Sequence, residues 1–191
     1  YHATPAAAYA NIHDRSLYGE IAAQLVDNDF APDILIGGGR EYFKPESHTD
    51  PETDEPGGRE DNRDIASEME ARGYYYIQDQ ADFDSWNPEE QRKVLGLFEY
   101  SHKDYELDRG QDELGEPALS EILRKTLAAL GDNPEGFFLL VEEGRIDHAA
   151  HDNDQQRLLA ECAAFDHTVG VALDYLQNHP NTLLLIASDH G

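Results

Sequence analysis

Cysteine is almost absent from this sequence, since Cys162 is the only one in 191 residues. An intramolecular disulfide is therefore impossible within the chain, and a cysteine-based metal site is excluded. Cys162 lies in an alanine-rich stretch with helical periodicity, which predicts a small buried side chain. Long apolar runs are also lacking: none approaches transmembrane length, and no charged-then-apolar signal segment is visible at the N-terminus.

Basic residues are scarce as well, with 14 Lys and Arg against 40 Asp and Glu, which gives a formal net charge of -26. Such an excess repels nucleic acid backbones and anionic membranes, so we expect neither as a partner. An anionic substrate would also be repelled at long range. A phosphate site in this chain would therefore need a local positive field from metal ions and arginine.

What the sequence does contain is a set of short apolar runs, with 39% hydrophobic residues overall, which predicts a folded protein. The length suits one compact domain or the middle of a larger one. The patterns predict strands at residues 33–36, 74–77, 137–141 and 182–187. They predict helices at residues 65–73, 88–96, 117–130 and 154–176, and broken helical segments within residues 6–26. Three glycines at positions 37–39 predict a turn or a close backbone approach, and residues 44–63 a polar surface loop or insertion.

The order of strand, long helix and strand between residues 137 and 187 predicts a parallel crossover unit. The expected fold class is therefore α/β, with a mainly parallel sheet covered by helices on both faces. In such sheets, ligand sites form at the carboxyl ends of strands. The acidic and histidine residues that follow these two strands should then meet in space.

The segment VEEGRIDHAAH, at residues 141–151, concentrates metal-ligand side chains. Asp147 and His151 are four residues apart, so on a helical turn they share one side and could grip one zinc ion. The same spacing is common by chance on a solvated helix face, which is the plainer interpretation of the pair alone.

Asp189 and His190 form a second pair directly after an apolar run, and their plainer interpretation is a strand-end cap. Two zinc ions held close together could activate a nucleophile and neutralise a leaving oxygen in phosphoryl transfer. Glu142 with a hydroxyl such as that of Thr4 would suit magnesium, although Thr4 before Pro5 is also a typical helix N-cap.

Five segments together resemble the alkaline phosphatase family, in the family's order along the chain. They are HATPAAAYANIHDR, DILIGGGREYF, GLFEYSHKDYELDR, VEEGRIDHAAH and IASDHG. The resemblance implies that residues 1–191 are an internal part of a single three-layer α/β domain. It also implies hydrolysis of phosphate monoesters through a phosphoserine intermediate, two zinc ions and one magnesium ion per active site, a homodimer, and a periplasmic or extracellular location.

Carried over by motif position, the resemblance assigns a role to each candidate residue. Asp147 and His151 would bind the first zinc, and Asp189 and His190 the second. Thr4 and Glu142 would bind magnesium. Arg15 would hold two phosphate oxygens as a bidentate fork, which a lysine could not reproduce. His2 and His148 would lie just outside the ligands and orient them.

Three departures from the family pattern stand out. Glu143 occupies a place where the family usually has a small residue, and Tyr1 one that is commonly threonine. The nucleophilic serine, an aspartate beside it and a late zinc-binding histidine have no counterpart here. We therefore expect the chain alone to be inactive. A phosphodiesterase or sulfatase of the same superfamily, and a noncatalytic metal-binding fragment, are the alternative interpretations.

The acidic excess leads to a prediction about salt. Because surface carboxylates repel one another less when they are screened, the melting temperature should rise as sodium chloride increases to molar levels. The scarcity of basic residues thus leads us to hypothesise a salt-adapted source. Thermal unfolding at graded salt concentrations tests this, and a melting temperature that falls with salt would contradict the hypothesis.

Overall fold

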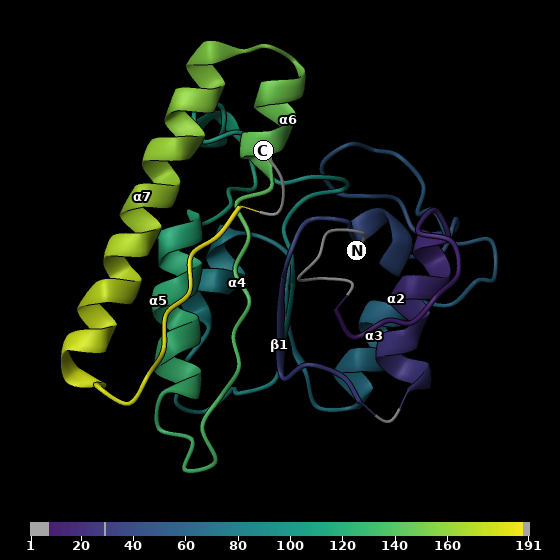
Figure 1. Cartoon of the computed structure of the whole chain (residues 1–191). Helices are drawn as coiled ribbons and strands as arrows, with labels where there is room; N and C mark the ends of the chain where they lie inside the picture. The colour runs from purple at the N-terminus through teal and green to yellow at the C-terminus, as the bar shows by residue number, and fades with distance from the viewer. Residues whose placement is uncertain (1–7, 29, 189–191) are drawn as a thin grey trace.

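The computed structural model describes residues 8–28 and 30–188 and consists of three layers. Its sheet is parallel, with strand order β1-β3-β2, from strands β1 (Ile34–Gly37), β2 (Tyr75–Ile77) and β3 (Val94–Leu97). Figure 1 shows helices α2 (Tyr18–Asp27) and α3 (Ile65–Ala71) on one side of it and α4 (Gln80–Ser85) and α5 (Leu119–Leu130) on the other. The expected α/β sandwich with a parallel sheet is confirmed.

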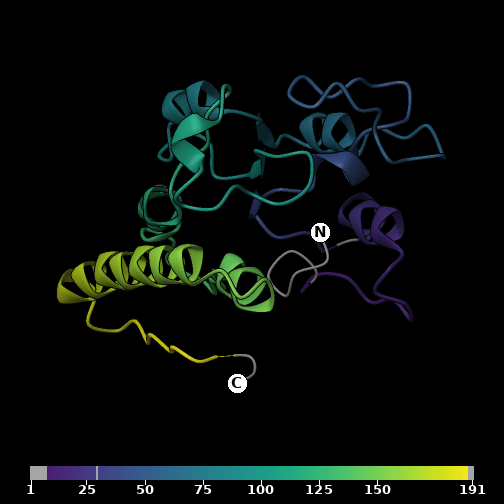
Figure 2. The same ribbon diagram turned by 90° about the horizontal axis from the view of Figure 1, so that it is seen from above.

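Two further helices lie outside this core. The long helix α7 (Gln155–Asn178) packs on α5, and α6 (Arg145–His151) packs on one end of α7, as the view from above shows (Figure 2). Two short 3-10 helices, Arg40–Phe43 and Arg109–Gln111, follow β1 and β3 in the chain. Among the described residues, no helix is both long and apolar enough to span a bilayer.

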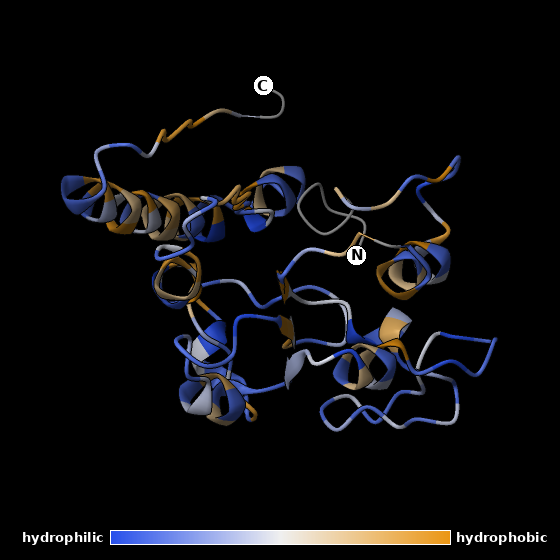
Figure 3. Cartoon of the chain, turned by 90° about the horizontal axis from the view of Figure 1, so that it is seen from below, coloured by the Kyte–Doolittle hydropathy of each residue, from blue (hydrophilic) through white to orange (hydrophobic). Residues whose placement is uncertain are grey.

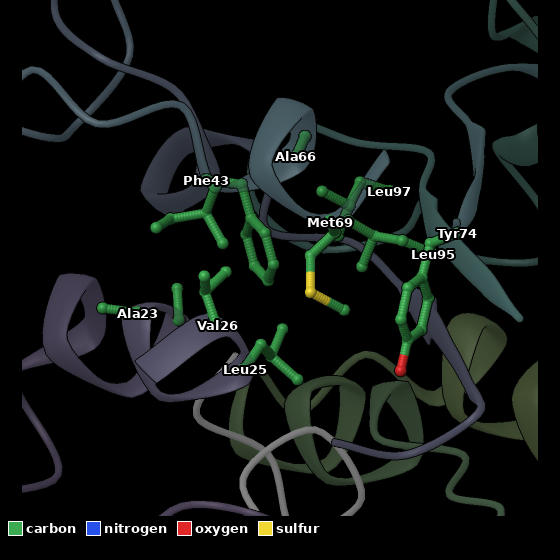
Figure 4. Close-up of a cluster of buried hydrophobic side chains, with 11 residues drawn as sticks. Ala23, Leu25, Val26, Phe43, Ala66, Met69, Tyr74, Leu95 and Leu97 are labelled. Atoms are coloured by element: carbon green, nitrogen blue, oxygen red, sulfur yellow. The ribbon is translucent and has the colours of Figure 1, made fainter. Parts of the chain in front are cut away.

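The side chains of each strand alternate between two hydrophobic clusters, one on each face of the sheet. Leu95 and Leu97 of β3 join the cluster formed with α2 and α3, which is drawn in Figure 4. Val94 of the same strand joins the other cluster, with Phe83 of α4 and Ile122 of α5. This period of two is what a strand buried on both faces requires. The layers are thus held together by apolar burial through the sheet.

The central strand was missed by the sequence prediction, which placed a helix at residues 88–96. That prediction is wrong: β3 begins at Val94, all four of its residues are buried, and residues 88–93 form turns and a bend. Charged residues that favour helices precede an apolar run whose burial on both faces decides its conformation. Strands 33–36 and 74–77 are confirmed as β1 and β2, within one residue at each end.

The two other predicted strands, residues 137–141 and 182–187, are not strands in the structure. Both segments carry no helix or strand assignment, and Phe138, Leu183 and Leu185 are 88%, 79% and 80% exposed. The apolar stretch near the C-terminal end is visible in Figure 3. A strand needs a neighbour to complete its ladder, and within the described chain neither run pairs with the sheet. The predicted crossover unit is therefore absent here, although its long helix is present as α7.

The predicted helices 65–73, 117–130 and 154–176 are confirmed as α3, α5 and α7. Asp154 caps α7, where its carboxylate accepts hydrogen bonds from the backbone N–H groups of Gln156 and Arg157, both at 3.1 Å. Cys162, expected to be buried, is exposed on α7 instead. The reason is that α7 lies on the outside of α5 and keeps one side open to solvent (Figure 2).

The turn after β1 brings the chain close to a second loop. A Cβ atom on Gly38 would lie 2.3 Å from the carbonyl oxygen of Ser101, so only glycine fits there. Gly39 has a φ of 97°, in the left-handed region. The expected turn with a close backbone approach is confirmed at these two positions.

Arg40, directly after this turn, is the most connected buried side chain, with 1% exposure. Its Nε and Nη2 donate to Asp50 at 2.6 and 3.1 Å, and Nη2 also donates to Glu52 at 2.7 Å. Its Nη1 donates to the carbonyl oxygens of Leu97 and Phe98, at 3.1 and 2.7 Å. One guanidinium thus joins the end of β3 to residues 44–63, a segment whose only described strand-type pairings are two isolated bridges.

Replacing Arg40 should unfold this corner of the protein. Arg40→Leu leaves the carboxylate of Asp50 buried without its partner, and loss of one member of a buried pair costs about 3–5 kcal/mol of unfolding free energy. Denaturant unfolding of the variant measures this cost. The matched control is Arg92→Leu at an exposed position, which should stay within about 0.5 kcal/mol of the parent sequence. Equal stabilities of the two variants would contradict the role of Arg40.

Candidate metal centre

Helix α6 carries the predicted pair of metal-binding side chains on one turn. His151 Nε2 lies 3.4 Å from Asp147 Oδ1, and the two side chains are 78% and 41% exposed. The helix runs from Arg145 to His151 with Asp152 as its C-cap, and Asn153 with a φ of 55° turns the chain into α7. The expectation that Asp147 and His151 share one side of a helical turn is therefore met by the geometry.

His148, between these two residues, is held by neighbours on two sides. Arg145 Nη1 lies 3.2 Å from His148 Nδ1, and the His102 ring stands edge-on to the His148 ring with 4.5 Å between centroids. Burial lowers the pKa of His148, and the positive charge of Arg145 lowers it further. Both effects favour the neutral ring, whereas the charges of Asp147 and Asp152 oppose them.

Glu142 and Glu143 precede α6 in the chain and differ in their surroundings. Glu142 is exposed, whereas Glu143 shares a hydrogen bond with Glu161 of α7. Burial, together with the charge of Glu161, raises the pKa of Glu143 to about 7. Glu161 also accepts a hydrogen bond from the backbone N–H of Glu106 at 2.6 Å. The unusual acid at position 143 thus ties the approach to α6 onto α7.

Of the remaining candidate residues, the structure describes Arg15 alone. Arg15 is exposed in the turn before α2, in the layer across the sheet from α7 (Figure 1). His2, Thr4, Asp189 and His190 lie outside the residues that the structure describes. The structure therefore brings together Asp147, His148 and His151 and places Glu142 just before them.

A second group of carboxylates was missed by the sequence analysis. Glu52, Glu99 and Asp112 each offer one oxygen, and these oxygens all lie within 4.8 Å of one another. They line a cavity of about 270 Å³ together with Asp104 and Glu113. Three oxygens of this kind could hold a hard divalent cation. The three residues come from separate segments with no local motif, so only the folded chain reveals the group.

The electrostatics of this group are unfavourable in the absence of a cation. Burial raises the pKa of Glu99 to about 9, and the charges of Glu52 and Glu116 contribute. Burial and a hydrogen bond to Asp112 also raise the pKa of Glu52, although Arg40 opposes this. Oδ2 of Asp112 and Oε1 of Glu99 are buried without a hydrogen-bond partner among the described residues. Protons and cations therefore compete for the same oxygens.

Comparison with known proteins agrees with this fold. A family model described as alkaline phosphatase matches residues 1–191. The alkaline phosphatase of Gadus morhua is 35% identical over 100% of this chain and 44% of its own length. The tissue-nonspecific isozyme of Rattus norvegicus is 35% identical over 100% of the chain and 40% of its own.

Solved structures give the same result. Thermus thermophilus alkaline phosphatase superimposes with a TM-score of 0.81 at 31% identity, covering 95% of this chain and 35% of that one. The cold-active enzyme of a Shewanella species gives 0.72 at 35% identity, covering 94% and 38%. The fold is thus that of the alkaline phosphatase class of α/β hydrolases. The chain belongs to the alkaline phosphatase family, and it spans less than half the length of these relatives.

The raised pKa of Glu99 predicts a pH-dependent stability in chelator-treated protein. Between the ordinary pKa of a glutamate and about 9, the folded state holds a proton that the unfolded chain has lost. Stability must therefore fall as pH rises through this window. Glu99→Gln removes the titrating group, so its stability relative to the parent sequence should increase steadily with pH.

Denaturant unfolding at a series of pH values measures this difference. Glu89→Gln, at an exposed position, is the control and should differ from the parent sequence by a constant amount. A constant difference for Glu99→Gln as well would show that Glu99 titrates alike in the folded and unfolded states.

Proposed function

We propose that the protein of which this chain is part hydrolyses phosphate monoesters at alkaline pH. Membership of the alkaline phosphatase family over residues 1–191 supports this activity. The single observation that carries it in the structure is the pair of ligand atoms on α6, one carboxylate oxygen and one imidazole nitrogen 3.4 Å apart. We propose that two zinc ions and one magnesium ion occupy the full site.

The geometry of the α6 pair fits a zinc ion. Zinc binds oxygen and nitrogen ligands at about 2.0–2.1 Å, so two ligands of a tetrahedral ion lie about 3.3 Å apart. The Asp147 and His151 atoms match this separation without a change of helix geometry. Both side chains are open to solvent, which leaves access for an ion and its remaining ligands. The donor set of one oxygen and one nitrogen also suits zinc better than magnesium.

The remaining residues take roles that their chemistry allows. We assign Asp189 and His190 to the second zinc, and Glu142 with Thr4 to magnesium, because carboxylate and hydroxyl oxygens suit this hard ion. A mutant of TAB5 alkaline phosphatase, a structural neighbour, was solved with Mg bound in its M3 site. Arg15 would bind two phosphate oxygens through its planar fork and hold the phosphoryl group for attack. His2 and His148 would orient the ligands.

Metal ions held by these residues would supply positive charge at the reacting phosphorus and would lower the pKa of the nucleophile. The nucleophile in this proposal is a serine of the full-length protein that has no counterpart in residues 1–191. Its oxygen would bond to phosphorus as the ester's alkoxide leaves and takes up a proton, and water would then hydrolyse the phosphoserine to release inorganic phosphate. Arg15 neutralises the oxygens of the phosphoryl group in both steps. The local positive charge of this set offsets the repulsion of an anionic substrate by a chain with net charge -26.

Three further properties belong to the same proposal. We propose a homodimer and a periplasmic or extracellular location, as the family resemblance implies. The acidic composition supports a salt-adapted source, since few basic side chains are present to balance the carboxylates.

Removing one zinc ligand tests the proposal most directly. In the full-length protein, Asp147→Ala should lower hydrolysis of a chromogenic phosphate monoester by about 100-fold or more and reduce the zinc retained after dialysis. The parent enzyme should lose activity on chelation and regain it when zinc and magnesium are restored. Asp166→Ala, at an exposed position on α7, is the control and should keep normal zinc content. Near-normal turnover of Asp147→Ala would refute the assignment.

A further inference from the structure

The ring of Tyr105 contacts two guanidinium groups that come from different helices. The Cζ atom of Arg145, the first residue of α6, is 3.8 Å from the centroid of the Tyr105 ring. Arg157, in the first turn of α7, has its Cζ 4.5 Å from the same centroid. A planar guanidinium stacks well on an aromatic face, so the buried tyrosine is a platform for both. The loop after β3 is thereby joined to the start of α6.

Each member of this stack has a second anchor. Arg157 Nη2 and Nε donate to Asp108 at 2.6 and 3.0 Å, and the Tyr105 hydroxyl donates to Asp152 at 3.4 Å. Asp152 is the C-cap of α6, so the tyrosine contacts both ends of that helix. The position of the Arg145 guanidinium is therefore fixed by the platform beneath it.

The fixed guanidinium faces one nitrogen of His148. Arginine is always protonated and can only donate hydrogen bonds. Its contact of 3.2 Å therefore requires Nδ1 of His148 to be the acceptor, which leaves the ring proton on Nε2. The edge-on His102 ring restricts the His148 ring from another side.

We propose that Arg145 is a positioning residue that holds His148 in its Nε2–H tautomer on the turn that carries Asp147 and His151. In this tautomer, His148 offers a hydrogen-bond donor through Nε2, and a phosphate oxygen or a bound water can accept from it. Without Arg145, the ring exchanges between two tautomers and offers the donor only part of the time. The functional half of this inference is the hydrogen bond from His148 Nε2 to a phosphate oxygen or water, and it rests on the proposed phosphatase site. The tautomer itself does not depend on that proposal.

The tautomer can be measured on the metal-free chain by long-range proton–nitrogen correlation of the histidine rings, which distinguishes Nδ1–H from Nε2–H. The parent sequence should show His148 as Nε2–H alone. Arg145→Met should shift the Nδ1 resonance toward its protonated value, because Nδ1–H becomes populated. Arg157→Met is the matched control, since it removes the other guanidinium that contacts the Tyr105 ring and keeps the contact of Arg145 to His148. It should leave the His148 spectrum unchanged.

Two results would overturn the inference. One is Nδ1–H in the parent sequence, a measurement that needs no variant to fold. The other is an equal shift in both variants, which would assign the effect to packing of Tyr105 rather than to the Arg145 contact.

In the full-length protein, the inhibition constant of inorganic phosphate tests the functional half. Arg145→Met should raise it by about three- to tenfold, the loss expected for one hydrogen bond, and Arg157→Met should not. An unchanged constant in Arg145→Met would overturn this half. Absence of turnover in the parent enzyme, together with the expected tautomer pattern, would count against the proposed function and support the role of Arg145.

Discussion

The buried guanidinium of Arg40 is the contact on which this corner of the fold depends. It satisfies two carbonyl oxygens at the end of β3, where the strand ladder has stopped, and pairs with Asp50 and Glu52 from a segment without regular structure. A lysine could not make these contacts together, because they need a planar fork with several donors. Through Glu52, the same side chain reaches the carboxylate group that includes Glu99. The guanidinium of Arg40 thus contacts the sheet, residues 44–63 and the edge of the acidic cavity at the same time.

The two candidate metal centres differ in how they are prepared. Asp147 and His151 are local to one helix and exposed, so an ion can bind with little rearrangement. Glu52, Glu99 and Asp112 are brought together only by folding, and burial keeps the pKa of Glu99 high. The first is prepared by geometry and the second by confinement of charge. The chain has few basic residues that could offset this buried negative charge, and Arg40 offsets part of it.

Sequence reasoning succeeded where a signal was local. Helices α3, α5 and α7 follow from their apolar spacing, and Asp147 with His151 follow from a separation of four residues. It failed at β3, because a continuous apolar run of four residues carries no period that separates strand from helix. It also failed at residues 137–141 and 182–187, where the pattern is that of a strand but no ladder forms.

Contacts between distant segments gave no signal at all. Glu52 and Glu99 are 47 positions apart, and the Tyr105 platform joins residues from a loop and two helices.

The exposed apolar runs affect how copies of this chain behave toward one another. Extended segments with Phe138, Leu183 and Leu185 in solvent are templates for pairing between molecules. Mutual repulsion of chains with net charge -26 keeps them apart in dilute buffer, and salt at 0.1 M screens that repulsion beyond about 10 Å. Salt ions therefore have two effects: they screen the repulsion between carboxylates within one chain, and they favour association between chains.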